Sequence, residues 1–111
     1  MLKEIVYLAH DNAIDLQLKV DGAAVDLAPV TRIVVRDLGC AWEADSAVTA
    51  AAFDWAAGGG VLKLRLGDEP IPPGSYTCYI ILYDPANPDG VVWDKVGIKT
   101  VAVCAVPVAG P

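Results

Sequence analysis

The feature that most constrains this chain is a rigid turn that leads directly into a long apolar run. The turn is Pro72-Pro73-Gly74, in which proline fixes φ and glycine permits positive φ. The run that follows, Tyr76–Tyr83, consists almost entirely of β-branched, aromatic and aliphatic residues. Such a run is typical of a strand that is buried on both faces. We therefore expect a central strand here.

Alternation of apolar and polar residues predicts further strands. In Ile14–Val20 every second residue is apolar, and Val61–Leu66 places its leucines at every second position. This period of two is typical of a half-buried strand. Further strands are expected at Ile5–Leu8, Thr31–Leu38, Val91–Trp93 and Ile98–Val106. Ala23–Leu27 is expected to be either a short edge strand or an extended return, because Pro29 interrupts it.

Three segments between these strands are harder to assign. Gly39–Ser46 suggests a loop that tucks Trp42 beneath itself, and Asp84–Gly90 is rich in turn-forming residues. Ala47–Ala57 is predicted as a strand that forms a hairpin with Val61–Leu66. Its alanine content leaves a helix as the main alternative.

These elements indicate an all-β fold. The chain has 111 residues, of which 55% are hydrophobic and 20% charged, so it can bury the core of one domain. Seven or eight short strands separated by turns predict an antiparallel β-sandwich. We expect residues 1–106 to form this single domain and residues 107–111 to form a C-terminal tail.

The charge and the N-terminal sequence narrow the partners and the compartment. The formal net charge is −6 and the isoelectric point is about 4.4, which disfavours binding to nucleic acid. The N-terminal residues lack the apolar stretch of a signal peptide, and no stretch approaches the length of a membrane span. We expect an intracellular protein with no membrane contact.

No arrangement of residues predicts catalysis or a bound cofactor. Cys40, Cys78 and Cys104 are widely spaced and include no metal-binding pair, so we expect free buried thiols. His10 is the single histidine and lies in a polar cluster typical of a turn. We therefore expect a protein that is not an enzyme and that uses neither metal nor cofactor.

The aromatic residues are the candidate functional residues, and three interpretations fit them. They can form ordinary core, a subunit interface, or a platform on which sugars stack. A carbohydrate-binding module requires at least two of the three tryptophans to be exposed on one face. The candidates are Trp42, Trp55, Tyr79, Tyr83 and Trp93.

Two patterns in the chain resemble immunoglobulin-like domains. Gly74, Tyr76 and Cys78 follow the G-x-Y-x-C pattern of immunoglobulin strand F. This resemblance implies that Tyr76 forms a tyrosine corner, with Gly74 in the turn before it. The spacing of Cys40 from Trp42 departs from the immunoglobulin pattern, so the disulfide does not carry over.

Three segments in order are similar to the small immunoglobulin-like domains of bacteriophage tail, baseplate and other virion proteins. They are Asn12–Leu27, Val30–Arg36 and Gly60–Tyr76, and together they span most of the chain. The resemblance implies a structural phage or prophage component that acts through protein–protein contacts, including contacts in a homo-oligomer. It also implies assembly in the bacterial cytoplasm and a final place in the virion. An unpaired strand edge, where Pro29, Arg32 and Arg36 do not blunt it, is a natural surface for such contacts.

Overall fold

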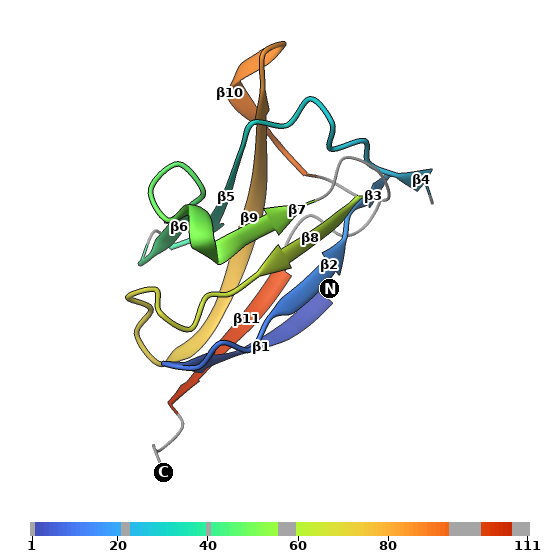
Figure 1. Cartoon of the computed structure of the whole chain (residues 1–111). Coiled ribbons are helices and arrows are strands. Elements are labelled where there is room, and N and C mark those ends of the chain that lie inside the picture. Colours follow the sequence, from blue (N-terminus) through green and yellow to red (C-terminus); the bar gives the residue numbers. More distant parts are fainter. Residues whose placement is uncertain (1, 21–22, 40, 56–59, 94–100, 108–111) are drawn as a thin grey trace.

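The long strand β9 (Gly74–Asp84) is the centre of the larger of two main sheets (Figure 1). The computed structural model describes residues 2–20, 23–39, 41–55, 60–93 and 101–107. On one side β9 pairs antiparallel with β5 (Arg32–Asp37). On the other side its first half pairs with β11 (Val101–Pro107) and its last residues with β10 (Asn87–Val92). The prediction of a central strand at Tyr76–Tyr83 is confirmed.

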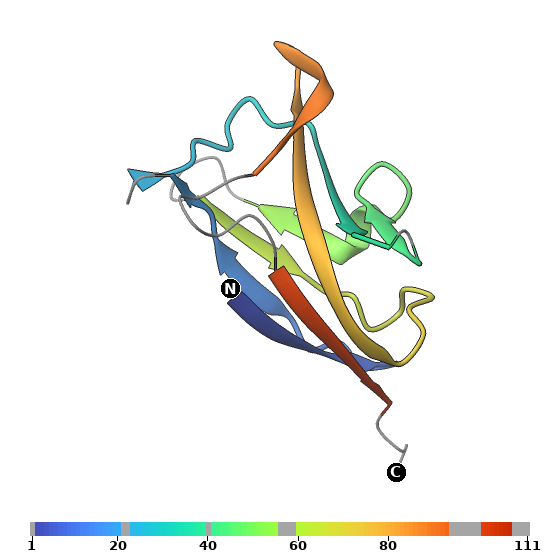
Figure 2. The same ribbon diagram turned by 180° about the vertical axis from the view of Figure 1, so that it is seen from behind.

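Two further strands complete this sheet, which we call sheet A. β6 (Glu43–Asp45) pairs antiparallel with β5 at one edge, and β1 (Leu2–Leu8) pairs parallel with β11 at the other. The order is β1-β11-β9-β5-β6, with β10 also on β9, and Figure 2 shows β1 beside β11 from behind. Sheet A is therefore mixed, and the expectation of a purely antiparallel fold is wrong at β1. The first and last strands run in the same direction, which no turn signal in the sequence specifies.

The second sheet, sheet B, contains β2 (Ile14–Gln17), β8 (Val61–Leu64) and β7 (Phe53–Trp55), in that order and all antiparallel. The alternation of β2 is confirmed, since its two apolar residues are buried and its two polar residues are exposed. Leu62 and Leu64 are likewise buried. A short hairpin of β3 (Lys19–Val20) and β4 (Ala23–Ala24) extends from the end of β2.

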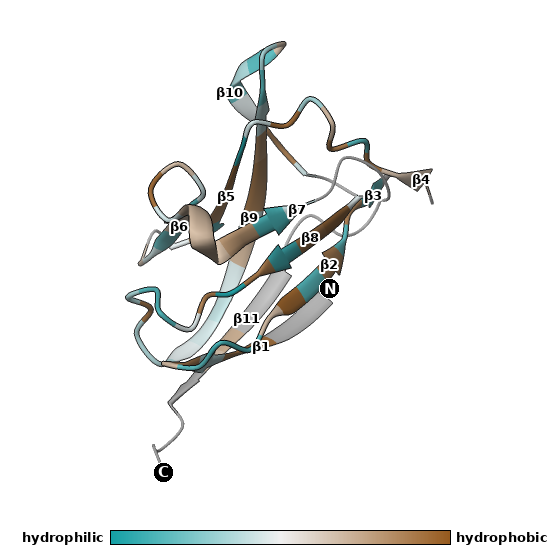
Figure 3. Ribbon diagram, in the orientation of Figure 1, coloured by the Kyte–Doolittle hydropathy of each residue, from teal (hydrophilic) through white to brown (hydrophobic). Residues whose placement is uncertain are grey.

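One hydrophobic core joins the two sheets. Inward-facing residues of sheets A and B belong to the same cluster of buried side chains. Figure 3 shows apolar and polar positions alternating along β2 and β8, as a sheet with one buried face requires. The fully buried members include Leu18, Leu27, Ile33, Leu62, Leu66 and Ile80.

The segment Ala47–Ala57 differs from both predictions made for it. Ala50–Ala52 forms one turn of 3-10 helix, η1, and only Phe53–Trp55 is a strand. The hairpin with β8 is confirmed, because Phe53 lies opposite Leu64. Alanine alone specifies neither state, and burial of Ala52 and Phe53 fixes where the strand begins. Ala56 and Ala57 lie outside the described residues.

Two other expectations about loops are wrong in part. Gly39–Ser46 does tuck Trp42 into the core, but it also contains β6. Asp84–Gly90 turns as expected only up to Asn87, where β10 begins. In both cases pairing with a neighbouring strand overrides the local turn signal. The described residues thus form eleven strand segments rather than the seven or eight expected.

The expected C-terminal tail is described only at its first residue, Pro107, which belongs to β11. Asp21, Gly22 and Cys40 lie outside the described residues.

Candidate functional site: dispersed aromatics and an open sheet edge

The five candidate aromatic residues do not form one site. Trp42 and Trp93 are buried, at 6% and 3% exposure. Trp55 is partly buried and packs against the core. Tyr79 and Tyr83 lie on the opposite face of sheet A, the face turned away from sheet B. The structure thus distributes them between the core and one outer surface.

Trp42 and Tyr76 form a packed pair beneath the turn at Pro72. Their rings meet edge to face, with centroids 5.8 Å apart and planes at 87°. The Tyr76 hydroxyl donates a hydrogen bond to the carbonyl oxygen of Pro72 at 2.5 Å, four residues upstream. Gly74 lies between them with φ of 153°, a value that residues with a side chain rarely adopt. The pair holds the start of β9 against the core.

Trp93 has a structural role at the far end of β9. Its backbone N–H donates to the carbonyl oxygen of Ile80, and its indole N–H donates to that of Lys19 at 3.2 Å. Trp42 and Trp93 are therefore both part of the core. A sugar platform needs two exposed tryptophans, and this requirement is not met.

Tyr79 and Tyr83 each lie opposite an arginine of β5 on the outer face of sheet A. The Arg32 guanidinium lies 4.5 Å from the centre of the Tyr83 ring and makes two hydrogen bonds to the Asp45 carboxylate. These bonds hold the pKa of Asp45 below its usual range and raise that of Arg32. The aromatic ring and the carboxylate together fix the guanidinium in place.

The β6 edge of sheet A is closed by ion pairs. Arg32 pairs with Asp45, and Arg36 donates to Glu43 at 2.8 Å, so both arginines of β5 reach across to β6. β6 is also only three residues long. Short edges that carry charges resist pairing with another chain. Arg32 and Arg36, named above with Pro29 as residues able to blunt an edge, lie on the interior strand β5.

The β1 edge has the opposite character. β1 is seven residues long and pairs with no described strand on its outer side. On its outward face Ile5 is 45% and Tyr7 38% exposed, while Val6 between them is buried. Ile5 to Leu8 contain neither a charged residue nor proline. β1 thus offers a seven-residue edge whose last four residues are uncharged and include two exposed apolar side chains.

The outer face of sheet B is polar by comparison. Lys63 lies between Asp15 and Asp54 on the neighbouring strands, and its ammonium group is 3.8 Å from the Asp15 carboxylate. Val61 is the one large apolar residue exposed on the described strands of this sheet. The exposed face of sheet B is therefore typical of a solvated surface.

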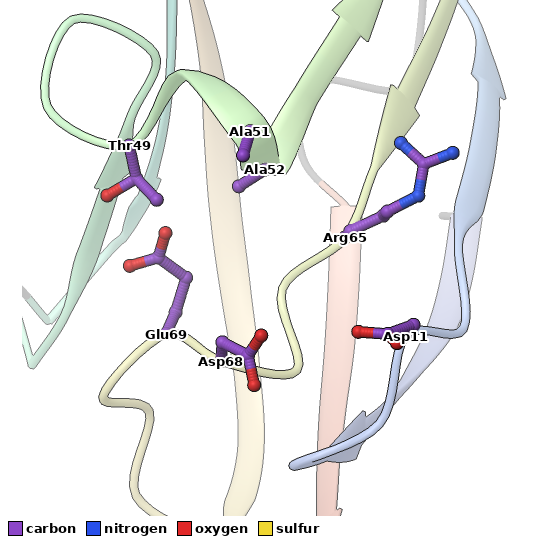
Figure 4. Close-up of a pocket in the computed structure, with 7 residues that line it drawn as sticks. All are labelled: Asp11, Thr49, Ala51, Ala52, Arg65, Asp68 and Glu69. Carbon is purple, nitrogen blue, oxygen red and sulfur yellow. The ribbon is translucent and has the colours of Figure 1, made fainter.

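A shallow pocket of about 240 Å³ lies between η1 and the loops that follow β1 and β8 (Figure 4). Glu69 points toward Thr49 on one side, and Asp11 and Arg65 lie on the other. One carboxylate oxygen of Glu69 is buried without a hydrogen-bond partner among the described residues. The lining residues are Asp11, Thr49, Ala51, Ala52, Arg65, Asp68 and Glu69. They include three carboxylates and one guanidinium but no cysteine or histidine.

Cys78 and Cys104 are free thiols, and burial raises the pKa of Cys78 to about 12. No cluster of acidic, histidine and cysteine side chains within the described ranges could hold a metal ion. In the same part of the chain, no helix has the length and hydrophobicity to cross a membrane.

Comparison with family models, with curated proteins and with solved structures gave no match.

Sequence reasoning predicted a strand at Ile5–Leu8 but missed its open edge. All four of these residues are apolar or aromatic, so the pattern does not reveal which face is exposed. The edge position follows from the parallel pairing with β11, which joins the two ends of the sequence. The alternation of Ile5 and Tyr7 with Val6 and Leu8 was the available signal for a shared face.

Proposed function

We propose that this protein is a non-enzymatic assembly component with an immunoglobulin-like fold, and that it acts through protein–protein contacts at the edge of sheet A. The observation that carries the proposal is the contrast between β1 and β6, the two ends of the strand order in this sheet. The β6 edge is short and crossed by ion pairs, whereas β1 is long, uncharged from Ile5 to Leu8, and exposes Ile5 and Tyr7. Exposed edges of this kind bind further strands.

The strand order supports the immunoglobulin-like assignment. Immunoglobulin variable domains place strands C′, C, F and G in one sheet and B, E and D in the other. The order β6-β5-β9-β11 and the order β2-β8-β7 correspond to these two sets. Tyr76 also lies two residues before Cys78 and bonds to the backbone upstream, as a tyrosine corner does.

The assignment to a phage or prophage particle rests on the resemblance of three segments, Asn12–Leu27, Val30–Arg36 and Gly60–Tyr76, to virion domains. On this proposal the protein is made in the bacterial cytoplasm and becomes part of the tail or baseplate. No catalytic step is needed for such a role.

The test is whether the protein is incorporated into particles. Prophage induction in the source bacterium, density-gradient purification of particles and quantitative mass spectrometry would measure its ratio to known tail proteins. We expect a constant ratio across the particle fractions, and tail or portal genes beside its gene. Recovery only in the soluble fraction, with metabolic genes as neighbours, would overturn the virion assignment.

A further inference from the structure

We propose that the partner of the open β1 edge is a second copy of this chain, paired antiparallel across a two-fold axis at Val6. In this dimer Ile5 of each copy lies opposite Tyr7 of the other, and the two A sheets become one continuous sheet. The inference deepens the proposed function, because it names a partner for the same edge.

The β1 edge is complementary to a second copy of itself. Ile5 and Tyr7 point to the same outer face of β1, two residues apart. A two-fold axis perpendicular to the sheet keeps the outer faces of both copies on one side. Antiparallel pairing about Val6 then places each exposed Ile5 against an exposed Tyr7, a type of cross-strand pair that stabilises sheets.

Pairing at the β1 edge gives a closed dimer that does not grow into a filament. In the dimer both β1 edges are used, and the strand order of the joined sheet then ends at β6 in each copy, with β10 paired to β9 alone among the described strands. Each β6 is three residues long and carries Glu43 and Asp45 in ion pairs with β5. A contact between identical surfaces about a two-fold axis forms a closed pair rather than a filament.

The net charge of the chain predicts how dimerisation depends on salt. Two copies with a formal net charge of −6 repel each other over most approaches. Residues Ile5 to Leu8 carry no charge, and in this register Glu4 of each copy pairs with Leu8 of the other rather than with a like charge. Salt screens the long-range repulsion. Dimerisation should therefore strengthen with salt, whereas binding of a basic partner to this acidic protein would weaken.

The size of the contact sets its strength. Pairing over residues 4–8 covers about 17 Å of strand, at about 3.4 Å per residue. A contact this small belongs to the weak, transient class of interfaces. We expect a monomer–dimer equilibrium that is visible only at high protein concentration.

Sedimentation equilibrium of the full chain, over roughly micromolar to millimolar concentrations, measures this equilibrium. We expect dimers at the upper end, and a severalfold tighter dimer when NaCl rises from about 0.05 to about 0.5 M. A strict monomer at all concentrations would overturn the dimer. Particle incorporation would still support the proposed function, so the two failures are distinguishable.

Single substitutions test whether the dimer contact lies at the β1 edge. Ile5→Lys and Tyr7→Glu should each weaken dimerisation about tenfold or more, because each places a charge opposite an apolar side chain. Val61→Lys is the matched control, since Val61 is 41% exposed on the outer face of sheet B, and it should leave dimerisation unchanged. Circular dichroism and thermal unfolding confirm that each variant is folded. An equal loss with Val61→Lys would contradict the location.

A mixture of the two single variants tests the register. A heterodimer of Ile5→Lys with Tyr7→Glu contains one lysine–glutamate pair and one native Ile5–Tyr7 pair. The mixture should therefore dimerise at low salt where neither variant does alone, as native mass spectrometry would detect. If pairing were centred on Ile5, the introduced charges would not face each other. If the mixture did not regain dimerisation, the register centred on Val6 would be excluded.

Discussion

At the scale of single residues, the hydroxyl of Tyr76 is the clearest local determinant of the fold. It bonds to the carbonyl oxygen of Pro72, while its ring packs edge to face on Trp42. Tyr76→Phe removes the hydrogen bond and keeps the ring. We expect a loss of about 0.5–1.5 kcal/mol in the free energy of unfolding, measured in urea.

The control for this substitution is Tyr79→Phe. The Tyr79 hydroxyl makes no hydrogen bond within the described structure, and its ring lies on the outer face of sheet A. Its removal should leave stability nearly unchanged. Equal effects at Tyr76 and Tyr79 would mean that the bond to Pro72 contributes nothing to stability.

The two described thiols should differ in reactivity. Cys78 is fully buried and its pKa is raised to about 12, so little thiolate exists at pH 8. Cys104 is partly exposed. With iodoacetamide at pH 8, peptide mapping should find Cys78 unmodified in the native protein and modified in urea, with Cys104 modified faster. Rapid native labelling of Cys78 would contradict its burial.

At the scale of elements, the pairing of β5 with β6 should make stability depend on acid pH. Arg32 holds the pKa of Asp45 below its ordinary value of 3.8. A carboxyl group with a lowered folded pKa stabilises the fold fully above its unfolded pKa, and this contribution is lost progressively as the pH falls below that value and through the folded pKa. Between about pH 5 and pH 3, Asp45→Asn should therefore lose less stability than the wild type in urea unfolding. Parallel losses in both proteins would show that the pair is not linked to folding.

The contact between the loops that follow β8 and β1 depends on a glycine. A Cβ atom at Gly67 would lie 2.0 Å from the carbonyl oxygen of His10, and the Gly67 carbonyl accepts a hydrogen bond from Ala9. Because the obstacle is backbone, Gly67→Ala must displace one of the two loops. We expect a loss of about 2 kcal/mol or more in urea unfolding. Gly39→Ala, which meets only the Asp37 side chain at 3.3 Å, is the control and should cost much less.

Some strands could be predicted from the sequence and others could not. Strands that alternate or follow a rigid turn were predicted, because period two and proline act locally, as in Ile14–Gln17 and Gly74–Asp84. β6 and the parallel pairing of β1 were missed, because both depend on partners distant in sequence. The candidate site was missed for the same reason. Indole rings suit both core and surface, so the burial of Trp42 and Trp93 could not be read from the chain.

At the scale of the whole molecule, the shared core predicts that the two sheets unfold together. Leu16 and Leu64 of sheet B and Ile33 and Ile80 of sheet A belong to one buried cluster. Neither sheet has a separate core among the described residues. A single domain of this size with one core is expected to unfold in one cooperative step.

The two buried tryptophans offer probes of this cooperativity. Trp42 packs on Tyr76 near the start of β9, whereas Trp93 bonds to Lys19 and Ile80 toward the other end of the molecule. With Trp55→Phe as the common background, Trp42→Phe and Trp93→Phe each leave one buried reporter. Their urea midpoints from fluorescence should coincide with the midpoint of the same variant from far-ultraviolet circular dichroism, because loss of either end exposes the common core. A fluorescence midpoint for the Trp93 reporter well below the circular dichroism midpoint would show that the region around Trp93 and β3 unfolds before the rest of the core. It would also show that the indole bond to Lys19 does not couple that end to the core.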